Sequence, residues 1–260
     1  MKTKYPILLV HGLGFKDFAY FKSFGRIDDK LKEEGFSVYR SKIDCFGTIE
    51  NNAIQLKEEV LKYLEKEKTQ KINIIAHSKG GLDAKHMISF LGMEDKVASL
   101  TTLSTPHKGS IVATKILKIP HFLLKFVAFF LNLWCRILGD KHPDSYKVCT
   151  ELVRIQNLNN ENLKFSKEVY CQSFSSTLKN PKDDFVMGIP LMFSHYFEKN
   201  NSDGIVSDDS AVFENYKGEA IDESISHTQI VDFMVTTKKK REKIYAFYNS
   251  LCEDLMKRGY

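Results

Sequence analysis

The chain has 260 residues, of which 43% are hydrophobic and 27% charged, and its formal net charge is +5. This length and composition are typical of one large globular domain with a substantial core. The positive excess is small and spread along the chain, so it does not indicate a nucleic-acid-binding protein. A basic run at 238–241 opens a predicted helix, and we interpret it as a solvated face.

The cysteines show no spacing typical of a metal-binding knuckle, and their number is odd. They are Cys45, Cys135, Cys149, Cys171 and Cys252. We therefore expect free thiols, as in a reducing compartment. The apolar run at 7–10 is too short for a signal peptide, and no cleavage site follows it. The expected location is cytoplasmic, or secreted if a leader segment was removed.

Short apolar runs alternate with helical patterns through the first 110 residues, which indicates a parallel sheet with helices on both faces. We expect a further strand at 168–174 and a closing helix at 238–256. No repeat or linker is visible, so the prediction is one α/β domain over residues 1–260. The predicted strands in the first part lie at 5–10, 36–39, 72–75 and 97–103, and the predicted helices at 27–34, 52–64 and 82–91.

The segment Ala-His-Ser-Lys-Gly-Gly at 76–81 lies between a predicted strand and a predicted helix. It resembles the G-x-S-x-G nucleophile elbow of α/β-hydrolases, with Ala76 in place of the first glycine. Small residues leave room for the strained turn, and the helix N-terminus favours negative charge beside the hydroxyl of Ser78. The alternative is an ordinary surface turn.

A serine nucleophile needs a base and an orienting carboxylate, which follow in the order serine, acid, histidine in α/β-hydrolases. His227 has the position expected of the base. The other histidines after Ser78 lie on the predicted elbow helix, too early in this order or in an insertion, and they are His86, His107, His121, His142 and His195. Asp203 is the preferred acid because Gly204 follows it in a tight turn. Its rivals are Asp208, Asp209, Asp222 and Glu223.

Large apolar residues dominate the stretch at 111–139, where the α/β alternation breaks. Its most apolar part, between Lys125 and Arg136, is too short for a transmembrane helix. We predict a pair of amphipathic helices that form a lid over the active site, within an insertion at about 111–150. Ordinary core helices are the alternative.

Five motifs in this order resemble bacterial triacylglycerol lipases of family I, in the branch found in Gram-positive bacteria. They are the first strand with His11-Gly12-Leu13-Gly14, the elbow at Ser78, the loop at 104–110, the Asp203-Gly204 turn and Ser226-His227. The resemblance implies an α/β-hydrolase fold with a helical lid and hydrolysis of carboxylic esters, above all acylglycerols, through an acyl-enzyme. Ser78, Asp203 and His227 would form the triad, and the backbone N–H groups of Leu13 and Lys79 the oxyanion hole.

The resemblance also bears on cofactors and partners. Family members often carry a structural calcium, but Gln229 stands where an acid is expected, and Asp183, Asp184 and Asp232 are the only nearby carboxylates that could serve as ligands. Some relatives hold zinc in an inserted loop, but no matching cluster is visible here, so we predict no metal and no cofactor. The expected partners are an ester or lipid substrate and a lipid–water interface contacted by the lid, with no nucleic acid and no membrane anchor. A carboxylesterase or phospholipase, and a non-catalytic lipid-binding protein, are the alternatives.

Overall fold

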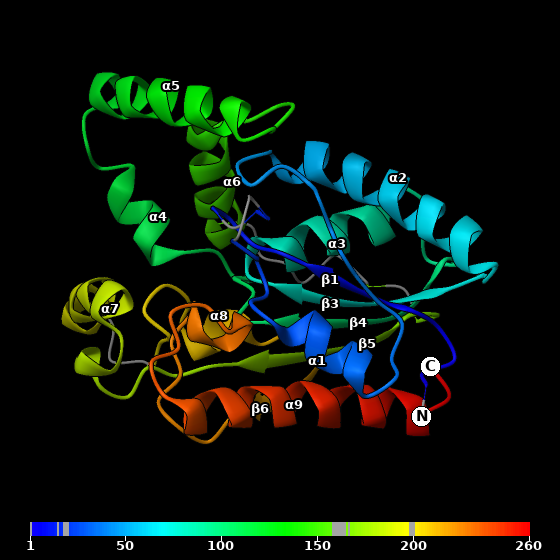
Figure 1. Ribbon diagram of the computed structural model, residues 1–260. Coiled ribbons are helices and arrows are strands. Elements are labelled where there is room, and N and C mark those ends of the chain that lie inside the picture. Colours follow the sequence, from blue (N-terminus) through cyan, green and yellow to red (C-terminus); the bar gives the residue numbers. More distant parts are fainter. Residues whose placement is uncertain (1, 15, 18–20, 158–164, 166, 198–200) are drawn as a thin grey trace.

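The computed structural model describes residues 2–14, 16–17, 21–157, 165, 167–197 and 201–260, and a parallel sheet forms its centre (Figure 1). In the described part of the chain the sheet has six strands in the order β2-β1-β3-β4-β5-β6. All five neighbouring pairs are parallel, as the alternating pattern predicts. The strands are β1 (Ile7–Val10), β2 (Val38–Arg40), β3 (Ile72–His77), β4 (Val97–Leu103), β5 (Tyr170–Ser175) and β6 (Asn215–Glu219).

Helices cover both faces of this sheet, which confirms the predicted layers (Figure 1). On one face lie α2 (Ile49–Glu67) and α3 (Lys79–Phe90), and on the other α1 (Ile27–Glu33) and α9 (Lys238–Lys257). Strand β1 shows why its sequence is apolar throughout. Leu8 and Val10 belong to the core under α2 and α3, whereas Ile7 and Leu9 belong to the core under α1 and α9.

Between β4 and β5 the described residues form three helices, and the first two lie in the apolar stretch at 111–139 from which a helix pair was predicted. They are α4 (Ile111–Ile116), α5 (His121–Ile137) and α6 (Ser145–Asn157). Pro120 precedes α5 and separates it from α4, since the residue before a proline disfavours helical backbone. In Figure 1, α5 lies apart from the sheet, beyond α4 and α6. None of the helices in the described part of the chain combines the length and the apolar character that a bilayer crossing demands.

Three elements have no counterpart in the sequence prediction. Helix α7 (Phe185–Phe197) is apolar on nearly every side, so it lacks the amphipathic period that reveals a helix. Strand β6 is a polar, half-exposed edge strand of five residues, and α8 (Asp208–Ala211) has only four. Two short 3-10 helices, η2 (Pro181–Asp183) and η3 (Gln229–Val231), complete this region.

Candidate active site

Ser78 occupies a strained turn between β3 and α3. Its backbone has φ 54° and ψ −134°, a conformation that a residue with a side chain rarely adopts. Two hydrogen bonds hold the turn in place. The N–H of Ser78 donates to the carbonyl of Leu103 at 2.9 Å, and the hydroxyl of Thr105 donates to the carbonyl of Ser78 at 2.8 Å. The sequence prediction of an elbow at this position agrees with this backbone.

The loop after β1 packs directly against Ser78. A Cβ atom at Gly12 would lie 2.6 Å from the Cβ of Ser78, and one at Gly80 would lie 2.4 Å from the carbonyl oxygen of His11. Real Cβ atoms essentially never approach so closely, so both positions require glycine. Leu13 follows Gly12 in this loop, and Lys79 follows Ser78 at the start of α3.

Ser78, His227 and Asp203 form a continuous hydrogen-bonded chain. The Oγ of Ser78 lies 2.9 Å from Nε2 of His227, and Nδ1 of His227 lies 2.7 Å from Oδ2 of Asp203. When Nδ1 carries the proton, it donates to the carboxylate, and Nε2 is then free to accept the proton of the serine hydroxyl. All three residues are buried, and Ser78 keeps 7% of its surface exposed. The structure thus brings together the three side chains that the sequence singled out.

The turn around Asp203 fixes the direction of its carboxylate. Oδ1 accepts hydrogen bonds from the backbone N–H groups of Ile205 at 3.0 Å and Val206 at 2.8 Å, which leaves Oδ2 for the imidazole. The backbone carbonyl of Asp203 also accepts from the N–H of His227 at 3.0 Å. An isolated bridge between Ser202 and Ser207 closes this turn.

The rival carboxylates bind other partners. Both oxygens of Asp208 lie within 3.3 Å of the hydroxyl of Thr177, and burial raises the pKa of Asp208. Asp222 is paired with Lys179 at 2.9 Å, and Glu223 is paired with Lys243. Among the other histidines, buried His107 has its Nε2 3.1 Å from the hydroxyl of Thr102, and His86 stacks near Phe90 on α3. The His195 side chain lies outside the described residues.

Asp184 supports the histidine loop and was not assigned this role from the sequence. Oδ2 accepts hydrogen bonds from the hydroxyls of Ser226 at 2.6 Å and Thr228 at 3.1 Å, the two neighbours of His227. Oδ1 accepts from the N–H groups of Val186 at 2.9 Å and Met187 at 3.0 Å, and so caps the start of α7. Burial alone would raise the pKa of Asp184, but these hydrogen bonds together lower it. An aspartate just before an apolar run is a helix-capping signal that the sequence does contain.

The ring of His77 packs on the candidate base. Its centroid lies 4.6 Å from that of His227, at an interplanar angle of 46°. Burial, and the nearby His227, hold the pKa of His77 well below its usual range. His77 therefore stays neutral and adds no positive charge beside the imidazole of His227.

Both predicted oxyanion donors lie on well-anchored backbone. Lys79 is the first residue of α3, so its N–H has no acceptor within the helix. Its buried ammonium pairs with Asp83 Oδ1 at 2.6 Å, and Asp83 Oδ2 accepts from Asn52 Nδ2 at 3.0 Å. Burial raises the pKa of Asp83 to about 6, although the Lys79 ammonium acts in the opposite direction. The loop of Leu13 is anchored through the N–H of Gly14, which donates to the carbonyl of Cys45 at 3.1 Å.

Two of the three carboxylates considered for calcium, those of Asp184 and Asp232, accept hydrogen bonds from protein donors. Asp184 holds α7 and the histidine loop. Asp232 Oδ1 accepts from Arg241 Nε at 2.9 Å, and its Oδ2 accepts from the hydroxyl of Tyr245 at 2.7 Å. Asp183 lies in η2, where its backbone carbonyl accepts from the amide of Gln229 at 3.0 Å.

Known proteins that are similar to this chain include serine esterases and lipases. The family model described as "Putative serine esterase (DUF676)" matches residues 4–175. Triacylglycerol lipase 2 of Saccharomyces cerevisiae is 29% identical over 250 residues, covering 88% of this chain and 72% of the yeast protein. A triacylglycerol lipase of Vibrio cholerae is 37% identical over 113 residues, but these span only 43% of this chain and 36% of the relative.

Among solved structures, the mature form of Bacillus licheniformis lipase BlEst2 superposes with a TM-score of 0.63 at 18% sequence identity. The superposition covers 96% of this chain and 93% of that structure, which shows a shared α/β-hydrolase fold. The family match extends over more than half of the sequence and includes both the loop after β1 and the elbow. The chain therefore belongs to this serine esterase family.

Proposed function

We propose that this serine esterase is a lipase that cleaves acylglycerols. Ser78 Oγ attacks the ester carbonyl while His227 Nε2 takes the hydroxyl proton, and Asp203 orients the resulting imidazolium. The N–H groups of Leu13 and Lys79 stabilise the oxyanion. His227 then protonates the departing alcohol, and water releases the fatty acid from the acyl-enzyme by the same route. The chain of contacts from Ser78 to Asp203 is the observation that carries the ester-hydrolase part of this proposal.

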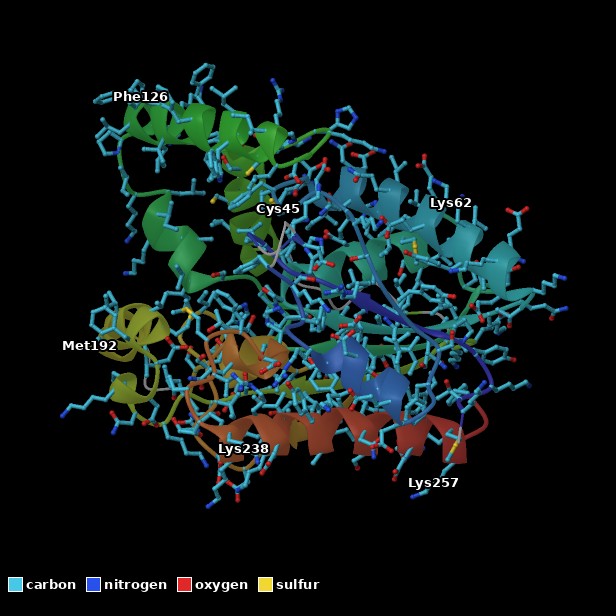
Figure 2. All side chains as sticks on the ribbon, in the orientation of Figure 1. Cys45, Lys62, Phe126, Met192, Lys238 and Lys257 are labelled. Atoms are coloured by element: carbon cyan, nitrogen blue, oxygen red, sulfur yellow. The ribbon has the colours of Figure 1, made fainter. Side chains whose placement is uncertain are left out.

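The surface of α5 supports a lipid substrate rather than a small polar ester. Only Ala128 and Cys135 are buried along this helix. Monomeric soluble proteins rarely expose a contiguous apolar surface of this kind without a binding role. Figure 2 labels Phe126 on α5, where side chains project away from the protein. The exposed apolar residues of α5 are Phe122, Leu123, Phe126, Val127, Phe129, Phe130, Leu133, Trp134 and Ile137.

A second apolar surface lies on α7, on the same side of the view as α4 and the outer end of α5 (Figures 1 and 2). Phe185 is 86% exposed and Met192 65% exposed. The sequence at 108–139 also contains five lysine or arginine residues and no acidic residue, which suits an interface that carries negative charge. We propose that the insertion at 111–150 acts as a lid whose apolar side chains, exposed in the structure, enter the lipid surface.

Several relatives, among them the yeast and Vibrio proteins, are named triacylglycerol lipases, and these names support a triacylglycerol substrate. From the five sequence motifs we also propose that the chain is related to the Gram-positive branch of the family I lipases. The free thiols of all five cysteines agree with a reducing, cytoplasmic location. A carboxylesterase or phospholipase would use the same triad, so the physical state of the substrate must separate these activities.

The test compares activity on emulsified triolein with activity on a short, monomeric p-nitrophenyl ester. We expect activity on long-chain esters to rise more than in proportion when substrate passes from monomers to an emulsion, because the apolar residues of α5 then leave water. Leu133→Asp and Phe129→Asp should lower the emulsion-to-monomer activity ratio by about tenfold, since a charge at the centre of the apolar surface opposes binding.

Leu61→Asp is the matched control, because Leu61 is 42% exposed on α2 and Leu133 is 47% exposed on α5. The control should keep the wild-type ratio. If the ratio is unchanged in both α5 variants, α5 does not contact the substrate surface and the lid proposal fails. A wild-type protein that cleaves the short ester but not emulsified triolein is a carboxylesterase.

A further inference from the structure

Two thiols and a carboxylate, far apart in the sequence, meet where α5 joins the rest of the protein. Cys45 lies in the loop between β2 and α2, Cys135 near the end of α5, and Asp140 in the turn that follows α5. Potential ligand atoms of the three residues lie within 4.8 Å of one another, and all three residues are buried. Figure 2 labels Cys45 in the region below α5.

The distances between these atoms suit a tetrahedral cation site. Cys45 Sγ lies 3.9 Å from Cys135 Sγ and 3.1 Å from Asp140 Oδ2. Two thiolates bound to one tetrahedral zinc ion are about 3.8 Å apart, and a thiolate and a carboxylate oxygen about 3.5 Å. Small adjustments of the side chains would therefore place all three atoms around one ion.

The charges around the cluster favour a cation. The ammonium of Lys16 lies 2.8 Å from Asp140 Oδ1, the oxygen that does not face Cys45, and 3.9 Å from Asp44 Oδ1, so one lysine faces two buried carboxylates. A divalent cation would balance two thiolates and leave the charges of these three side chains unchanged. A carboxylate ligand held by a second partner is typical of metal sites, because the partner fixes its orientation.

We propose that Cys45, Cys135 and Asp140 bind one thiophilic divalent cation, of which Zn²⁺ is the natural example. Two sulfur–metal bonds and one oxygen–metal bond form, the two thiol protons pass to water, and a water molecule completes the tetrahedron. These ligands were not connected by the sequence analysis, because they lie in segments that only the folded chain brings together.

The cation would fasten the base of α5 to the loop that supports the active site. That loop already holds the turn after α5, since Asp44 accepts from the N–H groups of Lys141 at 2.9 Å and His142 at 2.7 Å. The carbonyl of Cys45 also accepts from the N–H of Gly14, next to the proposed oxyanion donor Leu13. A bound ion therefore ties the insertion to the loop beside Ser78.

The experiment titrates Co²⁺ into the full chain, produced without a metal-binding tag and reduced with a phosphine. Cobalt replaces zinc in such sites and reports thiolate ligands by charge-transfer absorption. We expect one Co²⁺ per chain, the charge-transfer band, its loss on addition of Zn²⁺, and a higher Tm in the presence of Zn²⁺.

Cys45→Ser and Cys135→Ser should weaken cobalt binding by at least about tenfold and remove or halve the band. Cys149→Ser on α6 and Cys252→Ser on α9 are the matched controls and should bind as the wild type does. Circular dichroism of each variant verifies its fold. The titration of the wild-type protein tests the proposal even if a variant does not fold. Absence of the band in the reduced wild type, or a full band in both Cys45→Ser and Cys135→Ser, overturns the proposal. The proposal is also overturned if Cys45 and Cys135 are found joined in a disulfide and the protein, once this disulfide has been reduced, gives no cobalt band.

Discussion

The turn that contains Asp203 orients the carboxylate of this residue toward a single partner, His227. Its Oδ1 is taken by two backbone N–H groups of its own turn, so Oδ2 is the atom left to face Nδ1 of His227. Asp208 is nearby in the sequence, but its carboxylate faces the hydroxyl of Thr177. A glycine at position 204, with φ 107°, makes the turn of Asp203 accessible without strain.

Asp203→Asn should lower kcat/KM on a soluble p-nitrophenyl ester by about 10⁴, because the amide no longer selects the productive tautomer of His227. Asp208→Asn serves as the control and should lower it by less than about tenfold. Initial rates of the purified variants decide the matter. A nearly normal Asp203→Asn variant together with an inactive Asp208→Asn variant would assign the acid to Asp208.

Residues that lie in a recognisable motif could be predicted from the sequence, and a residue that no motif marks and whose partners lie far along the chain could not. Ser78 lies in a strand–turn–helix pattern whose small neighbours are visible in six consecutive letters. Asp184 reaches Ser226 over 42 positions and Thr228 over 44, so no local pattern connects it with the histidine loop. The catalytic roles of Ser78, Asp203 and His227 stay predictions, although the structure places their side chains in contact.

At the scale of elements, α7 links an exposed apolar surface to the active site. Its first turn is capped by Asp184, and a Cβ at Gly204 would lie 2.8 Å from the carbonyl oxygen of Met187, so α7 packs on the turn of Asp203. The same carboxylate that starts the helix holds the residues on both sides of His227. A displacement of α7 would therefore move both His227 and Asp203.

Asp184→Asn should lower the Tm at pH 7 by several degrees, because hydrogen bonds to a charged group contribute about 1.5–3 kcal/mol to stability. The pKa of Asp184 is lower in the folded protein than its ordinary value of 3.8. Its carboxylate therefore contributes fully above that value, and the contribution is lost as the pH falls through the lowered pKa. The difference in Tm between wild type and variant should shrink below about pH 4.

Thermal unfolding from pH 7 to pH 3 measures this difference. Asp209→Asn, at an exposed position on α8, is the control and should follow the wild-type curve. A Tm difference for Asp184→Asn that stays constant over the whole range would show that the hydrogen bonds of Asp184 do not depend on its charge.

Elements were predictable where their hydrophobic period was clear. Strand β4 was predicted with its observed bounds, and α9 within one residue. Helix α2 extends beyond the apolar pattern at 52–64, because Thr48 caps its start and Lys68 adopts a left-handed conformation at its end. Helix α7 has no polar face to set a period, and the predicted helix pair had no assigned boundary although Pro120 marks the break between α4 and α5.

At the scale of the whole molecule, the parallel order of the strands assembles the site. The loops that follow β1, β3 and β4 all leave the same edge of the sheet, where ligands bind in open α/β folds. These loops carry Gly12, Ser78 and Thr105, and Ser78 contacts both of the others. The alternation of strands and helices in the first 110 residues was sufficient to predict this edge. The position of α5, and the meeting of Cys45 with Cys135, depend on packing between segments 90 residues apart.

The measurement that tests the central claim most directly is covalent labelling of Ser78. A fluorophosphonate should add once to the wild-type chain, on the peptide that contains Ser78, and ester hydrolysis should fall in parallel with labelling. Ser78→Ala should take up no label, keep the fold, and lose about four to six orders of magnitude in kcat/KM. A Ser78→Ala protein that retains near-wild-type esterase activity, or a label found on another residue, would contradict the assignment of Ser78 as the nucleophile.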